Sequence, residues 1–237
     1  TALEGSLQRL QTDRIDLYQL HWPNRGSYHF RQAWNYDPTG QTRRPVDEFR
    51  EILETLGEFV REGKVRYVGL SNETTWGTAL WLQIAAEHGL PRIVSIQNEY
   101  NLLNRVFDLD LLELCHHEQV GLLSFSPLAA GLLTGKYEGG TIPPGSRGSI
   151  NEYLSGRRSV HSAGAVTAYL ALAREHGLDP AQMALAFLRD RPCMGSVIIG
   201  ATTMDQLATD IRAADLTLPE TVLDGIAAIR RTYPMPI

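Results

Sequence analysis

Short apolar segments alternate along the chain with longer segments whose apolar residues recur at helical spacing. Five segments have the length and composition of buried strands: 15–20, 65–70, 93–96, 121–125 and 196–199. Helices are expected at about 49–61, 75–88, 108–118, 163–176, 180–189, 204–214 and 219–232. This alternation is typical of βαβ units with a parallel sheet, so the chain is expected to be an α/β protein. No linker, repeat or low-complexity tract interrupts the pattern, which favours a single domain over residues 1–237.

Two connections in this pattern are unusually long. Residues 24–44 hold four aromatic side chains, Tyr28, Phe30, Trp34 and Tyr36, and residues 134–162 are rich in Gly, Ser and Arg. Loops above about 15 residues are uncommon in compact domains and are often functional lids, although a mobile surface insertion is the alternative for each. We expect residues 24–44 to cover a substrate.

The composition narrows the function classes. A formal net charge of -5 and a pI near 5.8 give no basic surface for nucleic acid. No apolar run is long enough to span a membrane, and no leader is expected. The two cysteines, Cys115 and Cys193, lack metal or disulfide spacing, which favours a reducing compartment, and we expect a cytoplasmic protein without a metal.

Polar residues follow the carboxyl ends of the expected strands, where parallel α/β folds build their sites. The five segments are His21-Trp22-Pro23, Ser71-Asn72, Gln97-Asn98, Ser126-Pro127-Leu128 and Gly200-Ala201-Thr202. Each alone is a weak signal, because such residues also serve as turns and structural hydrogen-bonding groups. Their convergence on one face indicates a site.

Longer motifs around these residues resemble the aldo-keto reductases. They read IDLYQLHWP at 15–23, GKVRYVGLSN at 63–72, IQNEYN at 96–101, SPLAAGLLTGKY at 126–137 and IIGAT at 198–202. The chain is most similar to the bacterial branch related to potassium-channel β-subunits. The resemblance implies a (β/α)8 TIM barrel that binds NADPH and reduces aldehydes or ketones to alcohols by hydride transfer.

The resemblance also assigns roles at the nicotinamide end of the cofactor. His21 would orient and polarise the substrate carbonyl, and Trp22 would contact the substrate. Side chains that bind the nicotinamide carboxamide or stack on its ring would be Ser71, Asn72, Gln97 and Phe125.

The phosphate groups of the cofactor would be bound further along the chain. The pyrophosphate loop would consist of Ser126, Pro127, Leu128, Ala129 and Gly131, with positive charge from Lys136 and Arg147. The 2'-phosphate and adenine would meet Gly200, Ala201, Thr202, Gln206 and Asp210. The family often has Asn where this chain has Asp210, and a carboxylate repels a nearby phosphate, so NADH stays open as an alternative cofactor.

The family's chemistry also needs an Asp, a Tyr and a Lys that the motifs do not provide. Lys64 precedes a strand and so lies on the opposite face, and Lys136 belongs to the pyrophosphate loop. The match begins just before the family's fourth strand, so residues 1–237 are expected to hold strands 4 to 8, about five of eight βα units, and the C-terminal helices. We expect these residues alone to be inactive, with the catalytic Asp, Tyr and Lys upstream of Thr1.

Two other classes of protein remain as alternatives. A nucleotide-sensing regulatory or interaction subunit would use the same cofactor site with little turnover. An unrelated barrel enzyme, such as an isomerase or a hydrolase, is disfavoured because no metal or carboxylate-pair spacing is present. The particular carbonyl substrate and a homo-oligomeric state stay open.

Overall fold

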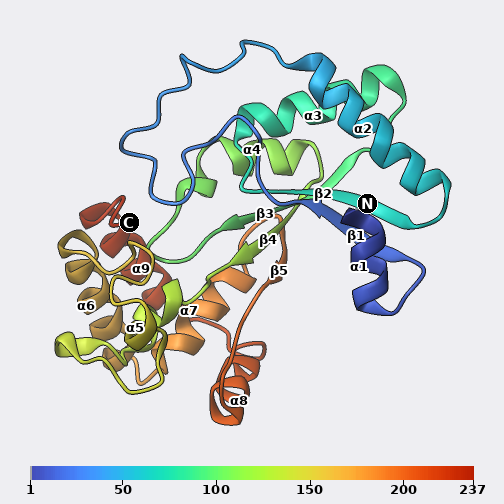
Figure 1. Ribbon diagram of the computed structural model, residues 1–237. Helices are drawn as coiled ribbons and strands as arrows, with labels where there is room; N and C mark the ends of the chain where they lie inside the picture. The colour runs from blue at the N-terminus through green and yellow to red at the C-terminus, as the bar shows by residue number, and fades with distance from the viewer. Residues whose placement is uncertain (1) are drawn as a thin grey trace. The chain divides into compact units, whose positions relative to one another are not determined.

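The computed structural model describes residues 2–237 (Figure 1). These residues divide into two compact units. Unit 1 holds residues 2–98 and 113–122, and unit 2 holds residues 99–112 and 123–237. A single domain over the whole chain stays a prediction.

The strands are β1 (Ile15–Leu20), β2 (Val65–Ser71), β3 (Ile93–Glu99), β4 (Gly121–Phe125) and β5 (Met194–Val197). They follow one another in the sheet in chain order, and the pairs β1–β2 and β2–β3 are parallel. The α/β class is therefore confirmed. The sheet of the described residues has five strands and is not a closed barrel.

Strand β2 runs one residue beyond the expected end, to Ser71, and two other strand predictions differ by more. Strand β3 runs three residues beyond the expected end, because the polar residues Gln97 and Asn98 stay in the ladder and Gln97 pairs with Ser71. The last strand was expected at 196–199, but β5 ends at Val197. The backbone N–H of Ile198 still donates to the Ser124 carbonyl at 2.9 Å. Ile198 of the apolar run therefore still hydrogen-bonds to β4, although it lies beyond the end of β5.

The helices are α1 (Ala2–Leu10), α2 (Val46–Arg61), α3 (Thr75–His88), α4 (Asp110–His117), α5 (Arg147–Ile150), α6 (Val160–Glu175), α7 (Pro180–Arg189), α8 (Met204–Arg212) and α9 (Glu220–Thr232). Short 3₁₀ helices are η1 (Val106–Asp108), η2 (Ala129–Thr134) and η3 (Glu138–Gly140). The helix expected at about 108–118 is confirmed as α4, which begins at Asp110 because Leu109 leaves the helical region with ψ near -124° and separates η1 from α4. The 134–162 connection is also broken up, by η3 and α5.

Local side-chain chemistry explains where two of the helices begin and end. The Thr74 hydroxyl accepts from the Gly77 backbone N–H at 3.2 Å and caps α3, which ends at Gly89 with a left-handed φ of 63°. The Asp179 carboxylate accepts from the Gln182 N–H at 3.0 Å and caps α7, whose first residue is Pro180. Both helices therefore have the bounds that the sequence predicts.

Each unit has its own apolar packing. In unit 1, α2 packs on α3 (Figure 1). The rings of Phe49 and Trp81 stack with centroids 4.2 Å apart. In unit 2, α6 packs against α9 and α7 against α8. Within residues 2–237 neither cysteine forms a disulfide; Cys115 is buried and Cys193 is partly exposed.

Residues 2–237 contain no helix with the length and apolar character needed to cross a membrane. Among the same residues, no three His, Cys, Asp or Glu side chains gather as a metal-binding group.

Candidate functional site

His21 and Trp22 directly follow β1 and lie at its carboxyl end. Both side chains are exposed, and their rings stack with centroids 4.5 Å apart. Trp22 also meets the edge of Phe30 at 6.1 Å. The imidazole is thus supported on one side and open to solvent on another, as a group that hydrogen-bonds a substrate must be.

Asn72 connects the segment after β2 to the segment after β1. Its backbone has a left-handed φ of 55°, which Asn tolerates better than most residues. Its side-chain amide donates to the His21 carbonyl at 2.9 Å and to the Ser71 hydroxyl at 3.0 Å. The Ser71 hydroxyl in turn donates to the Gln97 carbonyl at 2.8 Å. Four of the predicted residues of unit 1, His21, Ser71, Asn72 and Gln97, are therefore brought together.

One polar atom of this group lacks a partner. Asn72 is buried, and its Oδ1 has no hydrogen-bond donor within the described part of the chain. A buried carbonyl oxygen without a donor is costly, so such an atom needs a partner from outside the chain, such as an ordered water or a ligand. The carboxamide N–H₂ of a nicotinamide is a donor of the required kind, and unit 1 therefore fits the nicotinamide end of the cofactor. The Gln97 amide oxygen is already bonded, since it accepts from Gln19 at 3.0 Å.

In unit 2, the residues after Phe125 form a tight turn rather than an extended loop. Ser126, Ala129, Ala130 and Gly131 all have positive φ, and η2 is kinked within this segment. The Ala129 N–H donates to the Ser126 carbonyl at 2.9 Å. Turns with successive left-handed residues form anion-binding concavities, which is consistent with the predicted pyrophosphate loop.

Lys136 folds back over this turn. A Cβ atom placed on Gly131 would lie 2.5 Å from the Lys136 Cε and 2.9 Å from its Nζ, so a larger residue would displace the ammonium group from this position. Gly131 also has a φ of 95°, which favours glycine. The positive charge of Lys136 is thus held at the turn.

Tyr137 is a structural residue of this region that the sequence analysis missed. Its hydroxyl accepts from the Gly148 N–H at 3.0 Å, and its ring lies against Gly131 and Gly148. Because Gly148 follows Arg147, this contact brings the α5 N-terminus to the Lys136 segment. Arg147 itself is exposed. The sequence near Tyr137 does not indicate that its ring is buried beside these two glycines, so this role could not be predicted.

A buried ion pair supports the same turn. Arg157 donates to both Glu99 oxygens, at 2.8 and 3.0 Å, and the two side chains are 6% and 4% exposed. The Arg157 guanidinium also reaches the Ser126 hydroxyl at 3.4 Å.

The predicted 2'-phosphate segment precedes α8. Gly200, Ala201 and Thr202 are exposed, and they follow β5 after a gap of two residues rather than directly. The Gln206 side-chain oxygen accepts from the Thr202 N–H at 2.9 Å, so that oxygen is used within the turn. Asp210 is buried, and burial raises the pKa of its carboxyl, with Asp179 adding to the rise and Lys136 opposing it.

Aromatic residues of the 24–44 connection pack among themselves. Tyr28 meets the edge of Tyr36 at 5.9 Å, while Trp34 is 71% exposed. The connection contains turns but no helix or strand, as expected. Its role as a substrate cover stays a prediction.

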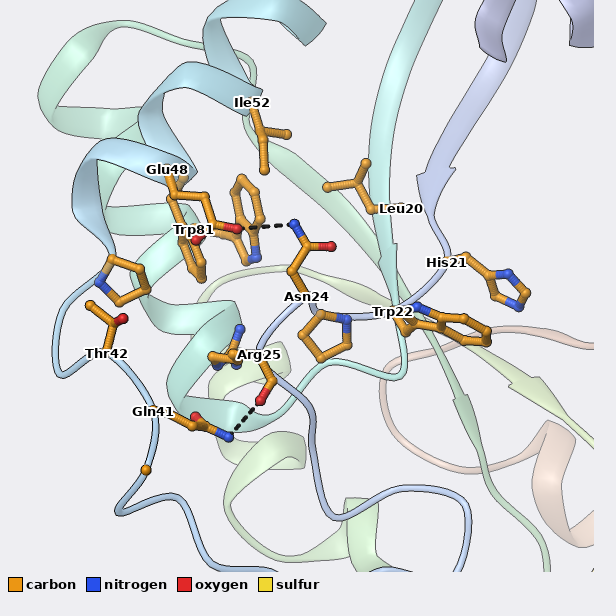
Figure 2. Close-up of a pocket in the computed structure, with 14 residues that line it drawn as sticks. Leu20, His21, Trp22, Asn24, Arg25, Gln41, Thr42, Glu48, Ile52 and Trp81 are labelled. Carbon is orange, nitrogen blue, oxygen red and sulfur yellow. Dashed lines mark hydrogen bonds between the residues drawn. The ribbon is translucent and has the colours of Figure 1, made fainter.

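A pocket of about 590 Å³ lies behind this connection, against α2 and α3 (Figure 2). Its apolar wall includes Leu20, Ile52 and Trp81, and its polar edge includes Asn24, Gln41 and Glu48. Asn24 donates to Glu48 at 3.0 Å, and Gln41 donates to the Arg25 carbonyl at 2.8 Å. His21 and Trp22 also line this pocket, at its edge near β1, and Figure 2 shows the His21 imidazole directed away from Trp81 and Glu48.

Lys64 lies where the sequence predicts. It directly precedes β2, whereas His21 follows the parallel neighbour β1, so the two side chains belong to opposite ends of the strand pair. Its ammonium bonds Glu4 at 2.8 Å and Glu62 at 2.9 Å, and these contacts raise its pKa to about 12. Lys64 is thus a surface ion-pair residue in unit 1.

Comparison with known proteins defines the class. The model of the Aldo/keto reductase family matches residues 1–231. The chain belongs to the aldo/keto reductase family.

Individual relatives agree with this assignment. Protein tas of Escherichia coli (strain K12) is 47% identical over 235 residues, which cover 99% of this chain and 67% of that protein. An "Aldo-keto reductase" of Babesia bovis is 36% identical over 228 residues, covering 90% of this chain and 78% of that protein. A rice protein (Oryza sativa subsp. japonica) named "Probable voltage-gated potassium channel subunit beta" is 31% identical over 248 residues, covering 98% and 67%.

Proposed function

We propose that the protein carrying these residues is an NADPH-dependent oxidoreductase that reduces aldehydes or ketones to alcohols. The proposal goes beyond the family assignment in naming the cofactor and the reaction. It rests most directly on the buried Asn72 Oδ1, which lacks a donor and adjoins Ser71 and the His21 carbonyl.

NADPH supplies the hydride for this reaction when it is bound. In unit 1, the Asn72 oxygen would accept from the carboxamide and so fix which ring face is presented. The His21 imidazole would donate to the substrate carbonyl oxygen, which orients that group and favours negative charge on it. Trp22 would form the apolar wall beside the carbonyl.

In unit 2, the residues proposed for the phosphate groups act by charge and backbone geometry. The Lys136 ammonium lies beside Gly131 of the 126–131 turn, and the bond from the Gly148 N–H to the Tyr137 hydroxyl brings the backbone next to Arg147 close to the residue that follows Lys136. Cations of this kind bind pyrophosphate by charge-assisted hydrogen bonds. The Asp, Tyr and Lys that complete proton transfer in the family are proposed to lie outside residues 1–237.

A regulatory subunit that senses nucleotide is the second candidate, favoured by the similarity to the rice channel-subunit relative. The same site residues would bind the cofactor in both cases. Turnover therefore separates the two candidates, and binding does not.

The test uses the full-length protein. NADPH and NADH affinities would be measured by fluorescence, and oxidation of each cofactor would be followed with a panel of aldehydes and ketones. We expect tighter binding of NADPH than of NADH, turnover of at least one carbonyl, and a kcat about 100-fold lower in His21→Asn at little cost in NADPH affinity. Tight binding without turnover would favour the regulatory candidate, and absence of NADPH binding would exclude both.

A further inference from the structure

A buried ion pair links the loop that carries His21 to the loop that carries Asn72. The Arg25 guanidinium donates to both Glu73 oxygens, with NH1 to Oε2 at 3.0 Å, and to the Thr74 hydroxyl at 3.2 Å. The two charged side chains are 11% and 3% exposed. Glu73 also accepts from the Thr74 N–H and from the Trp81 indole, so its carboxylate is fully engaged.

Further hydrogen bonds run between the same two loops. The Ser27 hydroxyl donates to the Asn72 carbonyl at 3.2 Å, and the His29 Nε2 lies 3.2 Å from the Glu73 carbonyl oxygen. Together with the bond from Asn72 to the His21 carbonyl, these contacts connect positions 21–29 to positions 71–74 along their length. The ion pair is the charged contact in this series.

Helix α3 is adapted to the pair. A Cβ atom on Gly77 would overlap the Arg25 guanidinium and the Glu73 carboxylate, so a larger residue there would displace the ion pair. Glycine within a helix is unfavourable relative to alanine, and this residue therefore indicates a steric requirement. The guanidinium also lies over the rings of Phe49 and Trp76, at 5.6 and 5.1 Å from their centroids.

We propose that Arg25 and Glu73 are positioning residues that hold His21 and Asn72 in the geometry needed for hydride transfer. This inference rests on the proposed reductase function. Neither residue touches the reacting atoms. The pair sets the distance between the loop that carries His21 and the loop that carries Asn72. Its loss would therefore lower kcat more than it weakens cofactor binding.

The chemistry of arginine is essential to this role. A planar guanidinium can bond both carboxylate oxygens and lie against two rings at once, whereas a lysine ammonium offers a single point of charge. Arg25→Lys keeps the charge but loses the two-point contact. Gly77→Ala keeps both charged residues and removes their space, so the two variants perturb one feature by independent routes.

The experiment compares these variants in the full-length protein with Gly57→Ala as the matched control. Gly57 also lies within a helix of unit 1, and a Cβ there would meet only side-chain atoms of Pro91 and Leu90, the nearest at 3.3 Å. We expect kcat to fall about tenfold in Arg25→Lys and Gly77→Ala, with the NADPH dissociation constant changed less than about twofold. In Arg25→Ala, added guanidinium ion should restore part of kcat.

The results separate the possible explanations. Unchanged kcat in Arg25→Lys, or loss of NADPH binding in parallel with activity, would overturn the inference while leaving the reductase function intact. If the ion pair had a purely structural role, the variants would contain fewer active molecules, each with a normal kcat. Titration of the cofactor-binding sites would reveal this, and that result would also overturn the inference. A wild-type protein that reduces no carbonyl would overturn both proposals.

Discussion

Units 1 and 2 each contain a buried pair of one arginine and one glutamate, and both pairs tie a long connection back to the end of a strand. Arg25 lies early in the connection after β1 and bonds Glu73, two residues beyond β2. Arg157 lies late in the connection after β4 and bonds Glu99, the last residue of β3. The two pairs are similar in burial and in their two-point geometry.

Their surroundings differ. The Arg25 pair adjoins the segment of His21 and Asn72, whereas the Arg157 guanidinium extends to Ser126 in the turn proposed to bind phosphate. Under the two proposals above, the same ion-pair chemistry would support a reaction geometry in one unit and an anion-binding turn in the other. Substitutions should separate these two effects.

Neutralising the carboxylates should give the largest effect, and it should be similar in both units. Glu73→Gln and Glu99→Gln each leave a buried guanidinium without its counter-charge, which typically costs about 3–5 kcal/mol. Urea unfolding of the full-length protein would measure the loss. A loss below about 1 kcal/mol in either variant would show that water or another group compensates that arginine.

Gly131→Ala should affect unit 2 through Lys136. The added methyl group would displace the ammonium, and we expect the NADPH dissociation constant to rise about tenfold, the usual effect of losing one charge-assisted hydrogen bond. Gly177→Ala is the control, because Gly177 also has a positive φ but nothing lies within 4 Å of its added Cβ. Equal effects of the two substitutions on binding would mean that backbone strain, and not Lys136, is responsible.

Arg157→Lys should have a smaller effect of the same kind. The lysine keeps charge near Glu99 but loses the contact with Ser126, so we expect NADPH to bind about fivefold more weakly with kcat at saturation nearly unchanged. Fluorescence titration and steady-state kinetics would test this. A fall in kcat without a change in affinity would remove the distinction between the two ion pairs.

Asp210→Asn should change cofactor preference the least, by about threefold in favour of NADPH, because it removes a negative charge near the proposed phosphate segment.

Burial raises the pKa of the Asp210 carboxyl. The folded state therefore holds this proton more tightly, and its contribution to stability decreases as the pH rises through the unfolded and then the folded pKa. Urea unfolding of wild type and Asp210→Asn from about pH 3 to pH 7 should show the variant gaining relative stability as the pH rises. A constant difference would contradict this.

Elements with strong local signals could be predicted from the sequence. Helix α7 has both of the bounds expected from Asp179 and Pro180, and β1 and β4 match the apolar runs. Helix α1 was not predicted, although Leu3 and Leu7 are buried at a spacing of four and could have indicated it.

The parts of the site that depend on distant residues could not be predicted. Arg25 and Glu73 are 48 positions apart, and nothing near either residue shows that they meet. In the sequence, Gly77 is only an unfavourable residue within a helix, and the ion pair beside it in the structure explains why glycine is needed. The motif residues His21, Ser71 and Asn72 were identified because they lie at the carboxyl ends of expected strands, whereas the contacts that position them arise from tertiary packing.

The most direct test of this account is a side-by-side titration of NADPH into wild-type, Arg25→Lys and Arg157→Lys full-length proteins, with kcat measured on the same samples. The account predicts that Arg25→Lys binds NADPH as tightly as wild type but turns over about tenfold more slowly, and that Arg157→Lys binds about fivefold more weakly with nearly normal kcat. Identical behaviour of the two variants, or a wild-type protein that does not bind NADPH, would contradict it.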